Sequence, residues 1–163
     1  MKFQKTITRL KEILIQNNWT IATAESLTAG LVSSYLASIS GSSGYLKGGV
    51  VAYTIPIKAE MLDVDLEMAE KSNAYSPEVA EQMVIGVCDS FDTDLGISTT
   101  GYAEPSPDNN IEYPQAFVAI SIEGEINHKQ IFAPNRSRNK ARKCIAKQSI
   151  IFLLETIEAK LAK

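Results

Sequence analysis

Histidine and cysteine are scarce in this sequence of 163 residues. His128 is the only histidine, and the two cysteines, Cys88 and Cys144, both fall within helical apolar patterns. Protein zinc sites are built from several cysteine, histidine or carboxylate ligands, and apolar helix faces are ordinarily buried. We therefore expect two buried thiols and no metal site.

The sequence also lacks a long apolar run and an excess of basic residues. No stretch approaches the roughly 20 apolar residues that cross a membrane, and the N-terminus opens as an amphipathic helix, unlike a signal peptide. The 16 basic residues are outnumbered by 19 acidic ones, for a net charge of −3. A nucleic-acid-binding surface needs a basic stripe, so we expect no nucleic-acid partner. From the lack of a long apolar run and of a signal peptide, we expect a cytoplasmic protein with no membrane partner.

Length and composition are those of one globular domain. The chain is 45% hydrophobic and 21% charged, which is close to average usage, and 163 residues are enough for a sizeable core. No change of composition marks a linker. We expect residues 1–163 to form a single, standalone domain.

Helical and strand patterns alternate along the chain, which predicts an α/β fold with helices on both faces of a mixed central sheet, a three-layer α/β/α arrangement. Ser76 and Pro77 form a strong helix start, and Glu123-Gly124 predicts the turn of an antiparallel hairpin. The expected helices cover residues 6–16, 31–36, 58–62, 77–91 and a long C-terminal segment; the expected strands cover residues 19–24, 48–54, 95–100, 115–122 and 125–132. The stripe on the last helix is typical of core packing, although the helix is long enough for a homodimer contact. Residues 106–113 are expected to form a polar loop.

Ser26 follows the first predicted strand and precedes an apolar helix. A strand-to-helix turn leaves backbone N–H groups unpaired at the positive end of the helix dipole, where an oxyanion can be held. Ser26 could therefore be a nucleophile. The alternative is that Ser26 or Thr28 is an ordinary N-cap.

Tyr53 and Lys58 stand at the end of the strand that we expect beside the first one. If the two strands are neighbours, a phenol and an amine reach the same sheet edge as Ser26 and form a candidate Ser/Lys/Tyr site. The alternatives are a solvated lysine on a short helix and a tyrosine packed on the core.

Several blocks of the sequence, in order, resemble the CinA C-terminal domain family. They are residues 24–30 (AESLTAG), Gly41-Ser42-Ser43, residues 48–54 (GGVVAYT) with Lys58, Leu62 and Val64, residues 74–80 (AYSPEVA), residues 99–105 (TTGYAEP) and the segment around Arg138 and Arg142. The resemblance covers nearly the whole chain. The characterised activity of the family is nicotinamide-nucleotide amidase, or NMN deamidase, which converts nicotinamide mononucleotide to nicotinate mononucleotide and ammonia.

The resemblance implies a hydrolase of a small amide with no cofactor. Ser26 would attack the amide carbon, and Lys58, positioned by Tyr53 or sharing a proton with it, would act as the base. A lysine base must be neutral, so its pKa must fall from about 10.4 toward ~7 to 8. The oxyanion donors would lie in residues 27–30, and the substrate-binding residues that the resemblance implies are Glu25, Thr28, Ala29, Gly30, Thr100, Gly101, Ala103, Arg138 and Arg142. The two arginines could pair a phosphate or a carboxylate, or form a solvated helix start.

The sequence departs from the family pattern at the places where a nucleotide would bind. Leu27 and Ala29 replace a cysteine and a glycine of the first motif, and alanine fits there if φ stays negative. Glu104 replaces a glycine of the second loop, and Ser137 replaces an aspartate. In the block where the family has Lys-Pro-Val-Gly, Tyr113 replaces the lysine and Ala116 the glycine, so a cation and another glycine are lost. An ionised Glu104 would repel a substrate phosphate.

Two function classes follow from these observations. The first is a serine amidohydrolase acting on nicotinamide mononucleotide or a related small amide. The second is a non-catalytic paralogue that binds a nucleotide or acts as a regulatory module. Retention of Ser26, Tyr53 and Lys58 favours the enzyme, and Glu104 favours the binding module.

Overall fold

Five strands form one mixed sheet in the computed structural model, which describes residues 2–163. The strand order is β2-β1-β3-β4-β5, with β1 parallel to β2 and β3, and with β3-β4 and β4-β5 antiparallel. The strands are β1 (Ile21–Glu25), β2 (Leu46–Val51), β3 (Leu95–Tyr102), β4 (Gln115–Ile122) and β5 (Glu125–Phe132). Because β1, β2 and β3 are parallel, their carboxyl ends meet at one edge of the sheet.

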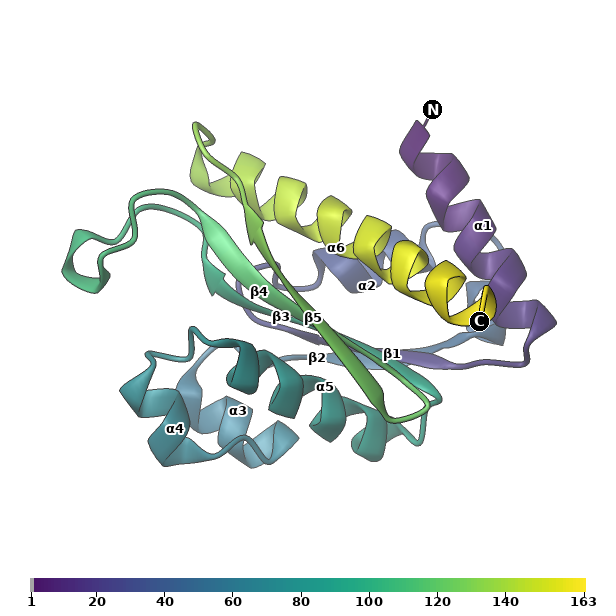
Figure 1. The fold of residues 1–163 in the computed structure, drawn as a ribbon, viewed down its shortest axis with the longest axis horizontal. Coiled ribbons are helices and arrows are strands. Elements are labelled where there is room, and N and C mark those ends of the chain that lie inside the picture. Colours follow the sequence, from purple (N-terminus) through teal and green to yellow (C-terminus); the bar gives the residue numbers. More distant parts are fainter. Residues whose placement is uncertain (1) are drawn as a thin grey trace.

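Helices cover both faces of this sheet (Figure 1). On one face lie α1 (Lys2–Gln16), α2 (Leu31–Ala37) and α6 (Arg138–Leu161); on the other lie α3 (Ile55–Leu62), α4 (Leu66–Lys71) and α5 (Pro77–Phe91). Each face has its own apolar core, and the core beneath α1, α2 and α6 is the larger. The expected three-layer α/β/α fold is confirmed.

Local sequence signals explain the elements that were predicted most closely. Ser76 Oγ accepts a hydrogen bond from the Val79 amide at 3.2 Å and Pro77 occupies the first turn, so α5 begins where these residues indicated. Glu123 and Gly124 both have positive φ, as a tight hairpin turn between β4 and β5 requires. On α6, Ala146, Ile150 and Ile157 are fully buried and Leu154 is partly buried, so most of the apolar stripe is core packing as expected. Leu161, the last residue of the stripe, is 49% exposed.

The segment between β2 and α5 differs most from the prediction. β2 ends at Val51, so Tyr53 lies beyond the strand, and α3 begins at Ile55 with Pro56 in its first turn, a position that needs no amide donor. The helix α4 was not expected. Its six residues are too few for apolar periodicity to be visible in the sequence.

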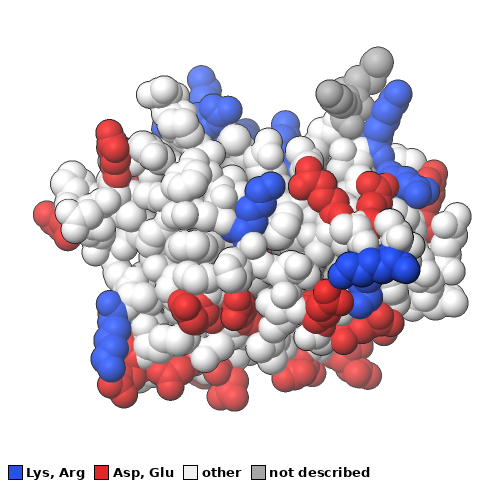
Figure 2. Space-filling view, viewed as in Figure 1, with Lys and Arg blue, Asp and Glu red and all other residues white. Residues whose placement is uncertain are grey.

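Charge is distributed unevenly between the two helical layers. The segment of residues 55–94, which contains α3, α4 and α5, carries ten acidic residues and two lysines, one of which is Lys58. The acidic side chains gather along the lower part of the view in Figure 2, over that layer. The rest of the chain therefore has 14 basic and nine acidic residues, an excess of positive charge.

Candidate active site

Ser26 lies at the carboxyl end of β1, where backbone hydrogen bonds connect the chain to the segments on both sides. Its amide donates to the Thr99 carbonyl of β3 at 2.9 Å, and the Glu25 carbonyl accepts from the Ala52 amide at 2.9 Å. Ser26 is only 7% exposed. The hydroxyl is thus fixed at the sheet edge that the parallel strands share.

The turn after Ser26 is capped by Glu25. Its carboxylate accepts hydrogen bonds from the amides of Gly30, Val32 and Ser33 at 2.8–3.0 Å, and Gly30 takes the left-handed N-cap conformation with φ 91°. A carboxylate here stabilises the positive end of α2. Neither Ser26 nor Thr28 is the N-cap, so the N-cap alternative was wrong, and the buried Glu25 side chain supports the turn.

Ala29 has a positive φ of 45°. The expectation that alanine would fit with negative φ was therefore wrong. A left-handed alanine costs roughly 1–2 kcal/mol, so the turn holds a conformation that a glycine would adopt more easily.

Lys58 reaches Ser26 from the first half of α3. Its Nζ lies 3.0 Å from Ser26 Oγ, 2.8 Å from the Ala52 carbonyl oxygen and 3.3 Å from the Tyr53 carbonyl oxygen. The side chain is 1% exposed, so the alternative of a solvated lysine was wrong. Burial lowers the pKa of Lys58 to about 8, in the direction that a neutral base requires.

The partners of Lys58 determine where its lone pair points when it is neutral. Two of the three partners are backbone carbonyls, which can only accept hydrogen bonds. A neutral amine has two N–H groups and one lone pair. If the two N–H groups stay on the carbonyls of Ala52 and Tyr53, the lone pair is directed at the hydroxyl of Ser26.

Tyr53 contributes its carbonyl to Lys58, but its phenol points elsewhere. The side chain is 52% exposed, and its hydroxyl accepts a hydrogen bond from Arg138 Nη2 at 2.8 Å. The alternative of a tyrosine packed on the core was wrong. The expected pairing of the phenol with Lys58 is not seen, because the chain leaves the sheet at Ala52 and the ring turns toward the start of α6.

Only some of the backbone amides in residues 27–30 lack an acceptor within the described part of the protein and could bind an oxyanion. The Ala29 amide donates to the Ser26 carbonyl at 3.0 Å, and the Gly30 amide donates to Glu25. Among residues 2–163, no acceptor is recorded for the amides of Leu27 and Thr28. These two are the candidate oxyanion donors.

A pocket of about 270 Å³ opens over Ser26, between the ends of β1 and β3 and the start of α6. Its lining includes five residues that were predicted for the site and five others. The predicted ones are Ser26, Tyr53, Gly101, Ala103 and Arg138, and the others are Leu27, Tyr102, Glu104, Pro105 and Ser106. Lys58 lies beneath this pocket, against Ser26.

The remaining predicted residues contact the protein instead of the pocket. Thr28 Oγ1 lies 2.7 Å from Thr99 Oγ1, and Thr100 Oγ1 donates to the Ala74 carbonyl at 2.6 Å. Arg142 donates to the carbonyls of Leu27 and Thr28 at 2.8 and 3.2 Å. Arg142 therefore holds the turn that carries Ser26, and neither arginine is a simple solvated helix start.

Sequence reasoning missed two kinds of group. The carbonyls of Ala52 and Tyr53 belong to the backbone and leave no signal in the residue types. Tyr102 was part of the family block, and its position at the end of a predicted strand next to Gly101 was a signal that it could line a site.

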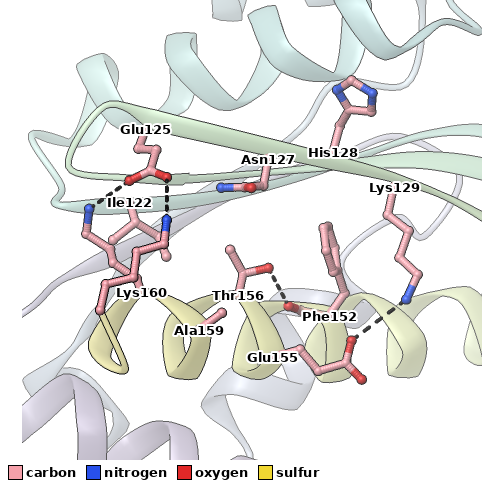
Figure 3. Close-up of a pocket in the computed structure, with 11 residues that line it drawn as sticks. Ile122, Glu125, Asn127, His128, Lys129, Phe152, Glu155, Thr156, Ala159 and Lys160 are labelled. Carbon is pink, nitrogen blue, oxygen red and sulfur yellow. Dashed lines mark hydrogen bonds and ion pairs between the residues drawn. The ribbon is translucent and has the colours of Figure 1, made fainter.

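A second, larger hollow of about 410 Å³ lies between β5 and α6 (Figure 3). Its charged groups pair with one another: Glu125 contacts Lys160 at 3.1 Å, and Lys129 contacts Glu155 at 3.7 Å. It brings together no nucleophile and base, so the Ser26 pocket is the candidate site.

Residues 2–163 contain neither a candidate metal-binding cluster nor a candidate membrane-spanning helix. They hold no group of three or more histidine, cysteine or acidic side chains placed to bind a metal. No helix among them is both long and apolar enough to cross a membrane.

Relatives and solved structures resemble this chain along most of its length. A protein of Bacillus velezensis, named as competence-damage inducible, is 37% identical over 155 residues, which cover 94% of this chain and 37% of that protein. A CinA-like protein of Prochlorococcus marinus is 40% identical and covers 77% of this chain and 30% of its own length. The crystal structure of a CinA superfamily protein from Klebsiella pneumoniae superposes with a TM-score of 0.91 at 21% identity, covering 98% of this chain and 99% of that one.

These relatives place the chain in a family and also show its extent. The chain spans about a third of the length of the curated relatives that it matches. The model of the CinA C-terminal domain matches residues 3–157. The chain belongs to the CinA C-terminal domain family.

Proposed function

We propose that this chain is a serine amidohydrolase of the nicotinamide-nucleotide amidase type, which hydrolyses a small carboxamide to an acid and ammonia. The observation that carries the proposal is the contact of 3.0 Å between Lys58 Nζ and Ser26 Oγ, with two carbonyls holding the amine. A buried lysine with a lowered pKa can act as the base that activates a neighbouring serine as a nucleophile.

The first half of the reaction would form an ester on Ser26. Neutral Lys58 takes the hydroxyl proton as Oγ bonds to the amide carbon, and the amides of Leu27 and Thr28 stabilise the oxyanion. Lys58, now protonated, gives that proton to the amide nitrogen. The C–N bond breaks, ammonia leaves, and the acyl group stays on Ser26.

The second half would return the enzyme to its starting state. Lys58, neutral again, takes a proton from a water molecule that attacks the ester carbon. The C–O bond to Ser26 then breaks, and Lys58 returns the proton to Oγ. One amide and one water give one acid and one ammonia.

The test is ammonia release from a panel of carboxamides, together with labelling of Ser26 by a serine-directed electrophile. The panel contains nicotinamide, its riboside and its mononucleotide. We expect Ser26→Ala to abolish release and labelling, and Lys58→Met to lower both by roughly 10²- to 10⁴-fold, the usual contribution of a general base.

Exposed residues at the amino end of β2, away from the pocket, supply matched controls. Ser43→Ala and Lys47→Met remove the same groups from the surface and should leave both readouts unchanged. A folded protein that neither labels nor releases ammonia would instead support the non-catalytic binding module, which Glu104 in the pocket lining favours.

A further inference from the structure

The pocket over Ser26 has one positively charged lining residue, Arg138, and one negatively charged lining residue, Glu104. Arg138 Nη1 donates to Glu104 Oε1 at 2.6 Å, so the two charges are paired at the mouth of the site. The pair is half exposed and contributes little to stability. Its effect is on the ligand, because the charges of the two charged residues that line the pocket cancel.

Both ends of the Arg138 guanidinium are already engaged. Nη1 binds Glu104 and Nη2 binds the Tyr53 hydroxyl at 2.8 Å. Arginine binds phosphate most strongly through two parallel N–H groups. A phosphate that used Nη1 would compete with Glu104, whose carboxylate would stay close to the phosphate oxygens.

The other two cations near Ser26 are engaged as well. The three hydrogen bonds of Lys58 go to Ser26, Ala52 and Tyr53. Arg142 donates to the carbonyls of Leu27 and Thr28 and to Asn139 Oδ1. Each of these cations next to the site is therefore already hydrogen-bonded within the protein.

We infer that the site takes a small carboxamide without a phosphate group, and that Glu104 is the residue that selects against the phosphorylated form by pairing with Arg138. The inference rests on the proposed amidase function for the identity of the reacting group.

Binding to Ser26→Ala tests the selectivity independently of turnover. The ligands are nicotinamide, nicotinamide riboside and nicotinamide mononucleotide; the last two differ by one phosphate. Titration calorimetry should give a dissociation constant lower by about fivefold or more for the riboside than for the mononucleotide, because a repulsion of about 1 kcal/mol between two unit charges at close range corresponds to that factor.

Glu104→Gln in the same background should remove the discrimination. We expect its affinity for the mononucleotide to rise about fivefold or more and its affinity for the riboside to change little. Inorganic phosphate, titrated alone, should bind Glu104→Gln and not the parent protein, and this gain should disappear in Glu104→Gln with Arg138→Met. Glu112→Gln is the matched control, since it removes the same charge from the same loop outside the pocket.

Three results would overturn the inference. They are tighter binding of the mononucleotide than of the riboside by the parent protein, no gain for phosphate or mononucleotide in Glu104→Gln, and an equal gain in Glu112→Gln. These outcomes leave the amidase proposal intact, because that proposal depends on ammonia release and Ser26 labelling. Conversely, if the wild-type protein does not label at Ser26 but the ligands bind with the expected preference for the riboside, only the amidase proposal would be overturned.

Discussion

Lys58 is the residue on which the chemistry of this pocket depends. Its ammonium is buried among two carbonyls and a hydroxyl, with no carboxylate recorded as a partner among the described residues. Burial without a counter-charge disfavours the protonated form, which is why its pKa falls to about 8. Glu25 is also buried, and its carboxylate accepts hydrogen bonds from three amides and a hydroxyl.

The pKa of Lys58 predicts the pH dependence of the reaction. The neutral form is the base, and it becomes the major form as pH rises through about 8. We therefore expect kcat/KM for the best amide of the panel to rise about tenfold per pH unit below 8 and to level off above it. Labelling of Ser26 by an electrophile, measured as a rate between pH 6 and 10, should follow the same curve.

The variant Lys58→Met is the control for this profile. Its residual activity should lack the rise through pH 8, because the group that titrates is absent. A midpoint near 10.5 in the wild type, or a profile that is flat across the range, would show that Lys58 is not the base.

At the scale of elements, the site is assembled from segments that are distant in sequence. β1 supplies Ser26, α3 supplies Lys58, the end of β3 supplies Gly101 and α6 supplies both arginines. The short helix α3 and the long helix α6 approach the turn from opposite faces of the sheet (Figure 1). The proposed reaction would therefore require the helices to keep their place on the sheet.

Arg142 is predicted to act by positioning the turn. Arg142→Ala removes the donors to the carbonyls of Leu27 and Thr28, which frees the segment that carries the candidate oxyanion amides. We expect kcat to fall on the order of 10²-fold with little change in KM, since small displacements of reacting groups have effects of this size.

The neighbouring Lys143 provides the control for Arg142. Lys143→Ala removes a cation from the same turn of α6 at an exposed position and should not change kcat. Equal losses in the two variants would mean that the loss reflects charge, whereas an increase of KM alone in Arg142→Ala would mean that this arginine binds substrate.

Gly86 sets the distance between α3 and α5. A Cβ atom at this position would lie 2.0 Å from the Leu62 carbonyl oxygen, at the end of the helix that carries Lys58. Helix propensity alone favours Gly86→Ala by about 1 kcal/mol, but the clash is with backbone atoms that cannot move alone. We expect Gly86→Ala to lower the free energy of unfolding by about 1–3 kcal/mol in denaturant titration, and to slow Ser26 labelling.

A second alanine substitution on α5 separates packing from propensity. Asp89 is exposed on the same helix, so Asp89→Ala should leave stability within about 0.5 kcal/mol of the wild type and labelling unchanged. A Gly86→Ala protein that is more stable than the wild type would show that α3 has room to shift.

At the scale of the whole molecule, charge differs between the two sides of the sheet. The layer formed by α3, α4 and α5 is acidic (Figure 2), and the rest of the chain has an excess of basic residues. The modest net charge of −3 therefore conceals an asymmetry across the sheet. The Ser26 pocket lies at the sheet edge between the two layers, where Arg138 and Glu104 meet.

Much of this arrangement could be predicted from the sequence, because local signals agreed with the tertiary packing. The Ser76-Pro77 start of α5, the Glu123-Gly124 turn and the layered fold depend on neighbouring residues or on periodicity. The approach of Lys58 to Ser26 followed from two strands being adjacent and parallel, which the structure confirms for β1 and β2.

The remaining features depend on contacts that no local pattern encodes. The direction of the Tyr53 ring is set by Arg138, which lies 85 residues further along the chain. The positive φ of Ala29 arises because the turn between β1 and α2 must close onto Glu25. Neither the hydrogen bond nor the turn conformation is visible until the strands and α6 are in place.

The long helix α6 extends from the pocket toward the C-terminus of the chain. Its 24 residues begin at Arg138 beside the pocket, and at 1.5 Å per residue they extend roughly 36 Å. The carboxyl end of the helix consequently lies at the opposite end of α6 from the pocket, whose lining includes Arg138. Figure 1 shows α6 running the length of the sheet to the C-terminus. A fluorophore, an affinity handle or a sensor surface joined to that end would leave the mouth of the pocket open to solution, so the protein can be immobilised for ligand measurements in a single orientation.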